Sequence, residues 1–146
     1  MPDEIARRGS LARAELGAGS IEWSGPKATT IGSDTTDVLS VNSLPIEQSA
    51  LLEVLQQWRR SLGTDAQIHL IERTRLERSS TWISTIRSRL GLGVEQFERD
   101  VVAAIRQVGW TITAIDRIDV ELDGERQRWV DLRATDVVGQ VEREMN

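Results

Sequence analysis

The chain has 146 residues, a net charge of −5 and no cysteine. This length suits one domain of about 100–150 residues. The absence of cysteine excludes a disulfide framework, a thiolate nucleophile and a cysteine-based zinc site. No apolar run approaches the roughly 18–20 residues of a transmembrane helix, and the first residues contain no apolar signal core. We therefore expect a protein that is not secreted through a signal peptide and has no membrane partner.

The basic residues are almost all arginine, with Lys27 the one lysine among 18 basic residues. This bias is what a high-GC genome or a salt-adapted (halophilic) host gives, and we favour that explanation over a special role for the arginine fork. The charge is uneven, because residues 58–89 carry seven Arg against three acids between two acidic flanks. The negative total argues against a dedicated DNA-binding domain. Nucleic acid is therefore an unlikely partner. If the chain binds nucleic acid, the basic segment of residues 58–89 is where we expect the contact.

Residues 1–37 predict an extended, Gly/Ser-rich arm. Five of the eleven glycines lie here, together with Pro2, Pro26 and many Ser and Thr residues. Neither a helical nor an alternating apolar pattern persists, which favours irregular structure. The remaining residues, 38–146, predict an α+β domain.

The first elements of that domain are a short strand at residues 38–41 and a helix. Apolar residues recur at helical spacing from Ile46 to Leu62, after a proline at the first turn. Residues 66–78 favour a strand, although a helix is the open alternative. A shorter helix over residues 82–90 is predicted next, and residues 94–108 then carry the apolar stripe of a further helix.

The clearest signal in the sequence is a C-terminal β-hairpin. Asp123-Gly124 is the favoured two-residue type I′ turn between alternating segments. The turn fixes the register of the facing pairs, which are Asp119 with Arg128, Glu121 with Arg126, and Ile118 with Trp129. All elements together predict an α+β two-layer sandwich of about three helices on a small, mostly antiparallel sheet, preceded by the irregular N-terminal arm.

Candidate catalytic groups are few. His69 is the only histidine and lies inside an apolar, strand-like run with no serine motif beside it. We interpret it as a partly buried strand residue rather than a catalytic base. Four carboxylates on a predicted strand are candidates for hydrolysis or Mg²⁺ binding: Asp116, Asp119, Glu121 and Asp123. Two of them face arginines across the hairpin, so structural pairing is favoured.

The N-terminal glycines do not form a phosphate-binding motif. Gly17, Gly19 and Gly25 match neither a P-loop nor a dinucleotide fingerprint, because both motifs need a preceding strand and a following helix. We therefore expect no catalytic residue, no metal and no cofactor.

Three segments resemble structural proteins of tailed viruses. The leader GSLARAELGAGSIEWSGP looks like the Gly/Leu-rich leaders of such proteins. The helix VVAAIRQVGW, followed by the hairpin IDVELDGERQRWVDL, is similar to small α+β proteins of virus necks, tail ends and baseplates. The resemblance implies a non-enzymatic subunit of a virion neck (the head–tail connector), tail or baseplate ring, found in the virion or the host cytoplasm.

On this hypothesis the partners are other copies of the chain in a ring and neighbouring structural proteins. A basic patch on one copy meeting an acidic patch on the next is the kind of contact that closes rings. The candidate contact residues come from the arm and the basic stretch: Leu11, Leu16, Ile21, Trp23, Arg59, Arg60, Arg73, Arg75 and Arg78. The alternative is a small regulatory or immunity-type protein-binding module, acting as a monomer or dimer, and an enzyme comes third.

Overall fold

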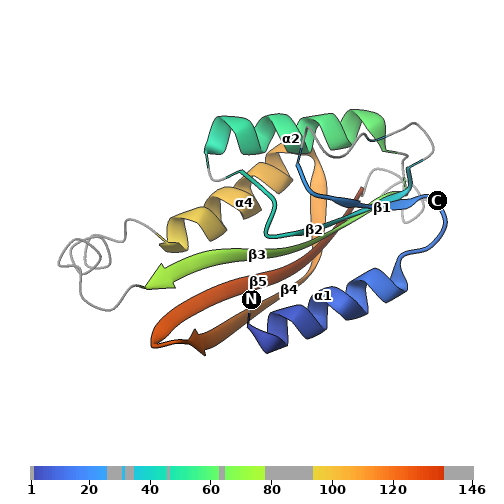
Figure 1. Ribbon diagram of the computed structural model, residues 1–146. Coiled ribbons are helices and arrows are strands. Elements are labelled where there is room, and N and C mark those ends of the chain that lie inside the picture. The colour runs from blue at the N-terminus through green and yellow to red at the C-terminus, as the bar shows by residue number, and fades with distance from the viewer. Residues whose placement is uncertain are drawn as a thin grey trace.

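The protein is built around one five-stranded sheet with helices on both of its faces (Figure 1). The computed structural model describes residues 2–25, 31, 35–45, 47–62, 65–77 and 94–136. The described elements, in chain order, are α1 (Asp3–Glu15), β1 (Ser20–Trp23), β2 (Asp37–Val41), α2 (Gln48–Ser61), β3 (Gln67–Glu77), α4 (Val94–Val108), β4 (Trp110–Leu122) and β5 (Glu125–Asp136). Among these helices, none combines the length and the apolar character that a membrane crossing requires.

The sheet is mixed rather than mostly antiparallel. Its strands lie in the order β1-β2-β3-β5-β4, in which β1, β2 and β3 are parallel and β5 is antiparallel to both of its neighbours. Helices α2 and α4 cover one face and α1 covers the other, so there are three layers (Figure 1). The α+β class is confirmed, but the two-layer antiparallel sandwich is wrong. The α2 crossover between β2 and β3 is what makes that pair parallel.

The N-terminal region also differs from the irregular arm that the sequence predicted. Residues 3–15 form α1, and residues 20–23 form β1, which pairs with β2. The buried face of α1 consists of Ile5, Gly9 and Ala12. Only one of these three residues is a large apolar side chain, so the stripe that identifies most helices is almost absent. Whether residues 1–37 and 38–146 are separable units stays a prediction.

The other elements agree with the sequence. The helices expected around residues 46–62 and 94–108 are α2 and α4, and residues 67–77 form a strand rather than a helix. The hairpin register is confirmed at every predicted pair, including Ile118 opposite Trp129 and Asp119 opposite Arg128. The helix expected at residues 82–90 lies outside the described residues.

The main core lies between the sheet and the two helices α2 and α4. Trp58 of α2 is completely buried at its centre. Its ring meets the ring of Trp23 on β1 edge to face, with centroids 5.4 Å apart and planes at 77°. Such a pair is worth about 0.5–1.5 kcal/mol beyond the area that it buries. The first strand is therefore joined to the rest of the core through two indoles.

A second, smaller core lies under α1, on the opposite face of the sheet. Ile5 and Ala12 of the helix contact a patch of the sheet formed by Leu39, Ile71, Ile118 and Trp129. These strand residues alternate with the side chains of the main core, as the period of two along a strand requires. The sheet is thus apolar on both faces, which is why it needs cover on both sides.

The hairpin turn gives a testable prediction about stability. Asp123 and Gly124 have φ values of 52° and 78°, in the left-handed region that glycine adopts without strain. We expect Gly124→Ala to lower the free energy of unfolding by about 1–2 kcal/mol, because a Cβ disfavours this conformation. Urea unfolding followed by circular dichroism would measure it. Gly17→Ala is the matched control, since Gly17 has no positive φ and no atoms within 4 Å of an added Cβ; equal losses in both variants would contradict the prediction.

Candidate functional site

The carboxyl ends of the parallel strands form the first candidate site. In open sheets with parallel strands, ligands bind in the crevice outside these ends. The last ladder pair of β1 and β2 joins Trp23 to Ser40. Gly25 and Asn42 each lie two residues beyond this pair, so the two chains leave the sheet at the same level. The residues that follow β1 and β2 therefore meet at one edge of the sheet.

Both of these exit positions have unusual backbone conformations. Gly25 has a φ of 126° and Asn42 a φ of 52°. The backbone N–H of Asn42 still donates to the carbonyl of Ile71 on β3, at 2.8 Å, and this bond holds the turn against the sheet. The Asn42 side chain is exposed, and asparagine is among the residues that tolerate this region.

A buried carboxylate fixes the loop that follows β2. Glu72 is 3% exposed, and its Oε1 atom accepts three hydrogen bonds. One comes from the hydroxyl of Ser40 at 2.9 Å, and two come from the backbone N–H groups of Ser43 at 3.3 Å and Leu44 at 3.4 Å. The carboxylate thus connects β3 to the chain that runs from β2 toward α2. Its place inside the protein makes it a group that positions the loop.

Burial changes the protonation of this carboxyl. Glu72 lines a small cavity with the apolar side chains of Val101, Val130 and Leu132. Desolvation there outweighs the three hydrogen bonds and raises the pKa of Glu72 to about 7. Near neutral pH, therefore, the loop after β2 rests on a group that is partly protonated.

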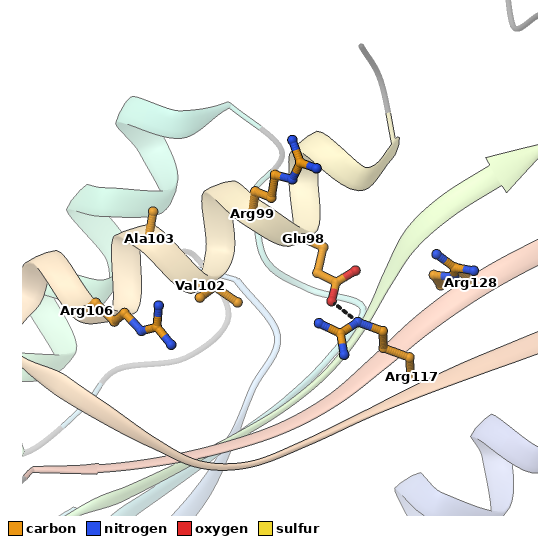
Figure 2. A pocket seen from close by; sticks show the side chains of 7 residues that line it. All are labelled: Glu98, Arg99, Val102, Ala103, Arg106, Arg117 and Arg128. Carbon is orange, nitrogen blue, oxygen red and sulfur yellow. Dashed lines mark hydrogen bonds and ion pairs between the residues drawn. The ribbon is translucent and has the colours of Figure 1, made fainter. Parts of the chain in front are cut away.

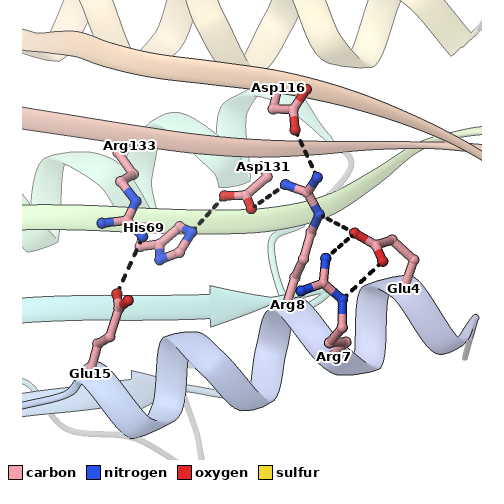
Figure 3. A network of polar contacts seen from close by, with 8 residues as sticks. All are labelled: Glu4, Arg7, Arg8, Glu15, His69, Asp116, Asp131 and Arg133. Atoms are coloured by element: carbon pink, nitrogen blue, oxygen red, sulfur yellow. Dashed lines mark hydrogen bonds and ion pairs between the residues drawn. The ribbon is translucent and has the colours of Figure 1, made fainter.

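A second group of polar side chains lies between α1 and the other face of the sheet (Figure 3). The guanidinium of Arg8 contacts three carboxylates, at 2.9 Å from Glu4, 2.8 Å from Asp116 and 3.0 Å from Asp131. The Nε2 atom of His69 lies 2.6 Å from the other oxygen of Asp131. One arginine therefore joins α1 to both β4 and β5, and Asp131 extends the connection to β3.

His69 is a partly buried residue of strand β3, as the sequence analysis expected. The histidine side chain is 17% exposed and that of Asp131 is 15% exposed. Burial opposes the ionisation of Asp131, but the hydrogen bonds from His69 and Arg8 outweigh it and hold its pKa below the usual range. Asp131 consequently stays ionised and attracts the Arg8 guanidinium of α1 to the sheet.

The predicted carboxylates are placed apart rather than gathered. Asp116 pairs with Arg8, and Asp119 pairs with Arg128 at 2.8 Å. Structural pairing, which the sequence favoured, is thus confirmed for Asp119. Within the described ranges, no three acidic or histidine side chains come together in a way that could hold a metal ion.

The predicted contact residues are also dispersed. Leu11 is 52% exposed on the outer side of α1, whereas Leu16 and Ile21 are half-buried against the two cores. Trp23 is 3% exposed inside the main core. The arginines lie on different elements: Arg59 and Arg60 on α2, and Arg73 and Arg75 on β3, while Arg78 lies outside the described residues. The contact role and the proposed self-association stay predictions.

Two residues of the candidate site were missed in the sequence. Glu72 is only one of the three acids counted within residues 58–89 in the sequence analysis, and Asn42 was not singled out. An asparagine directly after an apolar strand is a recognisable signal for a left-handed turn residue. Glu72 gave no such signal, because its neighbours come from β2 and the loop after it, some thirty positions earlier in the chain, as the span of 32 residues to Ser40 shows.

Comparison with solved structures shows a fold shared with a methyltransferase. No protein-family model and no curated protein matches the sequence. Among solved structures, a SAM-dependent methyltransferase from Methanosarcina mazei aligns over 92% of this chain and 78% of its own, with a TM-score of 0.50 and 12% identity. A candidate methyltransferase from Bacillus halodurans aligns over 93% and 80%, with a TM-score of 0.49 and 10% identity. At this identity the first of these similarities shows a shared fold.

These comparisons overturn the viral hypothesis. The solved structure that shares the fold is a SAM-dependent methyltransferase from Methanosarcina mazei and not a virion protein. The prediction of a virion neck, tail or baseplate subunit is therefore wrong. The prediction of a non-enzymatic protein is contradicted by the same similarity. The regulatory or immunity-type binder finds no support either. The resemblance misled because a helix followed by a charged hairpin occurs in many α+β proteins and carries no diagnostic residue.

Glu72 gives a prediction about the dependence of stability on pH. Its pKa is about 7 in the folded protein against an ordinary value of 4.5, so between these values the folded state binds the proton more tightly than the unfolded state. The contribution of Glu72 to stability is complete below the lower value and is lost as pH rises through the higher one. The shift corresponds to about 3 kcal/mol.

We expect Glu72→Gln to remove this loss, because glutamine keeps an accepting oxygen and cannot ionise. The quantity to measure is the difference in unfolding free energy between variant and wild type, by urea unfolding from pH 4 to pH 8. It should move in favour of the variant as pH rises. Glu53→Gln, on the exposed side of α2, is the matched control. A difference that does not change with pH would contradict the assignment.

Proposed function

We propose that this chain is a methyltransferase-type domain that binds S-adenosylmethionine across the carboxyl ends of β1 and β2. One observation carries the proposal. Gly25 and Asn42, both with positive φ, leave two adjacent parallel strands at the same level, which is where a sheet of this class takes its ligand. The name of the Methanosarcina protein, a SAM-dependent methyltransferase, supports the choice of ligand.

The residues at this edge suit such a ligand in two respects. An added Cβ on Gly25 would meet no atom within 4 Å, so a ligand has room to approach the backbone there. Asn42 offers an exposed amide with both donor and acceptor groups, which suits ribose hydroxyls or the amino-acid end of the molecule. The sequence between β1 and β2 carries Gly25 and Gly32, seven residues apart, rather than the closely spaced glycines of the dinucleotide fingerprint, so more of the binding falls to Asn42 and its loop.

Glu72 acts in this proposal as a positioning residue. Its hydrogen bonds to the N–H groups of Ser43 and Leu44 hold the chain immediately after Asn42. A fixed loop loses less conformational entropy on binding than a free one, and so favours affinity. S-adenosylmethionine, when bound, would supply an activated methyl group for transfer to a nucleophilic acceptor.

The proposal predicts that the chain binds S-adenosylhomocysteine, the stable product of methyl transfer. Isothermal titration calorimetry would measure the affinity. Asn42→Gly removes the amide and keeps the freedom to adopt positive φ, so we expect it to weaken binding about two- to tenfold, the value of a lost neutral hydrogen bond. Gly25→Val should weaken binding further, because its side chain would occupy the space at the strand end.

The controls for this experiment separate binding from folding. Gly17→Ala alters a glycine away from the edge of the sheet and should bind as wild type does. Near-ultraviolet circular dichroism would verify that each variant retains its tertiary packing. If the folded wild-type chain fails to bind S-adenosylhomocysteine, the proposal is wrong. Binding that is unaffected by both edge variants would place the ligand elsewhere.

A further inference from the structure

A basic pocket lies on the far side of the molecule from α1, between α4 and the β4–β5 hairpin (Figure 2). Its volume is about 470 Å³, within the range of about 300–1,000 Å³ typical of small-molecule sites. The lining residues come from α4, β4 and β5 and are Glu98, Arg99, Val102, Ala103, Arg106, Arg117 and Arg128. Four arginines against one glutamate give this lining a net charge of +3, in a chain whose total is −5.

Two of the four arginines are already paired. Arg117 of β4 donates to Glu98, a carboxylate that is only 8% exposed. Arg128 of β5 donates to Asp119 at 2.8 Å. These pairs fix the two guanidinium groups that rise from the strands, because each is held by a carboxylate on one side.

The other two arginines belong to α4 and have no ion-pair partner in the part of the chain that the structure describes. Arg99 and Arg106 are seven residues apart, or about 10 Å along a helix axis. Val102 and Ala103 lie between them at the i+3 and i+4 positions, on the same side of the helix. Figure 2 shows Arg106 extending from α4 toward the strands and Arg117 reaching back toward the helix. In the same view Arg99 extends away from the strands. Arg106 is therefore the α4 arginine that is directed into the space between the helix and the strands.

We propose that this pocket binds a small organic anion that carries a phosphate or carboxylate group on an apolar body. The oxyanion would accept charge-assisted hydrogen bonds from Arg106, which are stronger than those between neutral groups, and Arg99 would add attraction at longer range. The apolar body would lie against Val102 and Ala103. A nucleic-acid strand fits less well, because no aromatic side chain lines the pocket on which a base would stack. The site is separate from the proposed adenosyl site, and its test needs no adenosyl ligand.

The probes are phenyl phosphate and benzoate, which share an apolar ring and differ in the oxyanion. Calorimetric titration of the full chain should detect binding of at least one of them, and the tighter probe identifies the preferred oxyanion. We expect Arg106→Gln to weaken binding by about tenfold, as loss of a hydrogen bond to a charged group does, and Arg99→Gln to weaken it less. In the wild type, the backbone amide signals of Val102 and Ala103 should shift during the titration, while that of Ala12 in α1 should not.

Arg133→Gln is the matched control, because it removes one exposed arginine from the opposite face of the sheet, where Arg133 pairs with Glu15. It should keep binding within about twofold of wild type, since charges beyond about a Debye length are largely screened. Three results would overturn the proposal. They are no binding of either probe, an equal effect of Arg133→Gln and the pocket variants, and tighter binding of a single-stranded oligonucleotide that the same pocket variants abolish.

Discussion

The contact between Trp23 and Trp58 is the constraint on which the N-terminal half of the structure depends. Strand β1 has only four residues and pairs with β2 on one side alone, so its ladder hydrogen bonds cannot hold it by themselves. The indole of Trp23 anchors it against the completely buried ring of Trp58 on α2. With β1 held in this way, its carboxyl end lies beside the carboxyl end of β2. The two chains can then leave the sheet next to each other. The proposed ligand site is therefore a result of aromatic packing on the opposite side of the strand from α1.

Polar groups on the two faces of the sheet are stabilised in different ways. Under α1, Arg8 is surrounded by carboxylates from β4, β5 and its own helix, so attraction between opposite charges orients the helix over a small apolar core. On the other face, Glu72 has no cationic partner among its recorded contacts and accepts only neutral donors. The first arrangement favours ionised groups, and the second favours a proton. The same sheet thus holds a carboxylate with a lowered pKa at Asp131 and one with a raised pKa at Glu72.

The elements that the sequence predicted correctly are those whose signal is local. The hairpin follows from Asp123-Gly124, and α2 follows from large apolar residues such as Leu51, Leu55 and Trp58 at helical spacing. Helix α1 was missed because Gly9 contributes to its buried face without an apolar side chain. The parallel pairing of β1 with β2 was missed because no turn residue specifies which distant strand a segment joins. For the same reason the sequence could not show that Glu72 lies under the loop after β2.

The position of β5 has a consequence for how the chain acquires its structure during synthesis. β5 is the last strand in the described order, yet it lies between β3 and β4 and pairs with both. While the ribosome extends the chain from the N-terminus, the side of β3 that pairs with β5 stays unpaired until residues 125–136 have emerged. An unpaired apolar edge is a template for joining another chain. The hairpin therefore completes the sheet late, and nascent chains depend on the few seconds in which β4 and β5 emerge together, at about 5–20 residues per second.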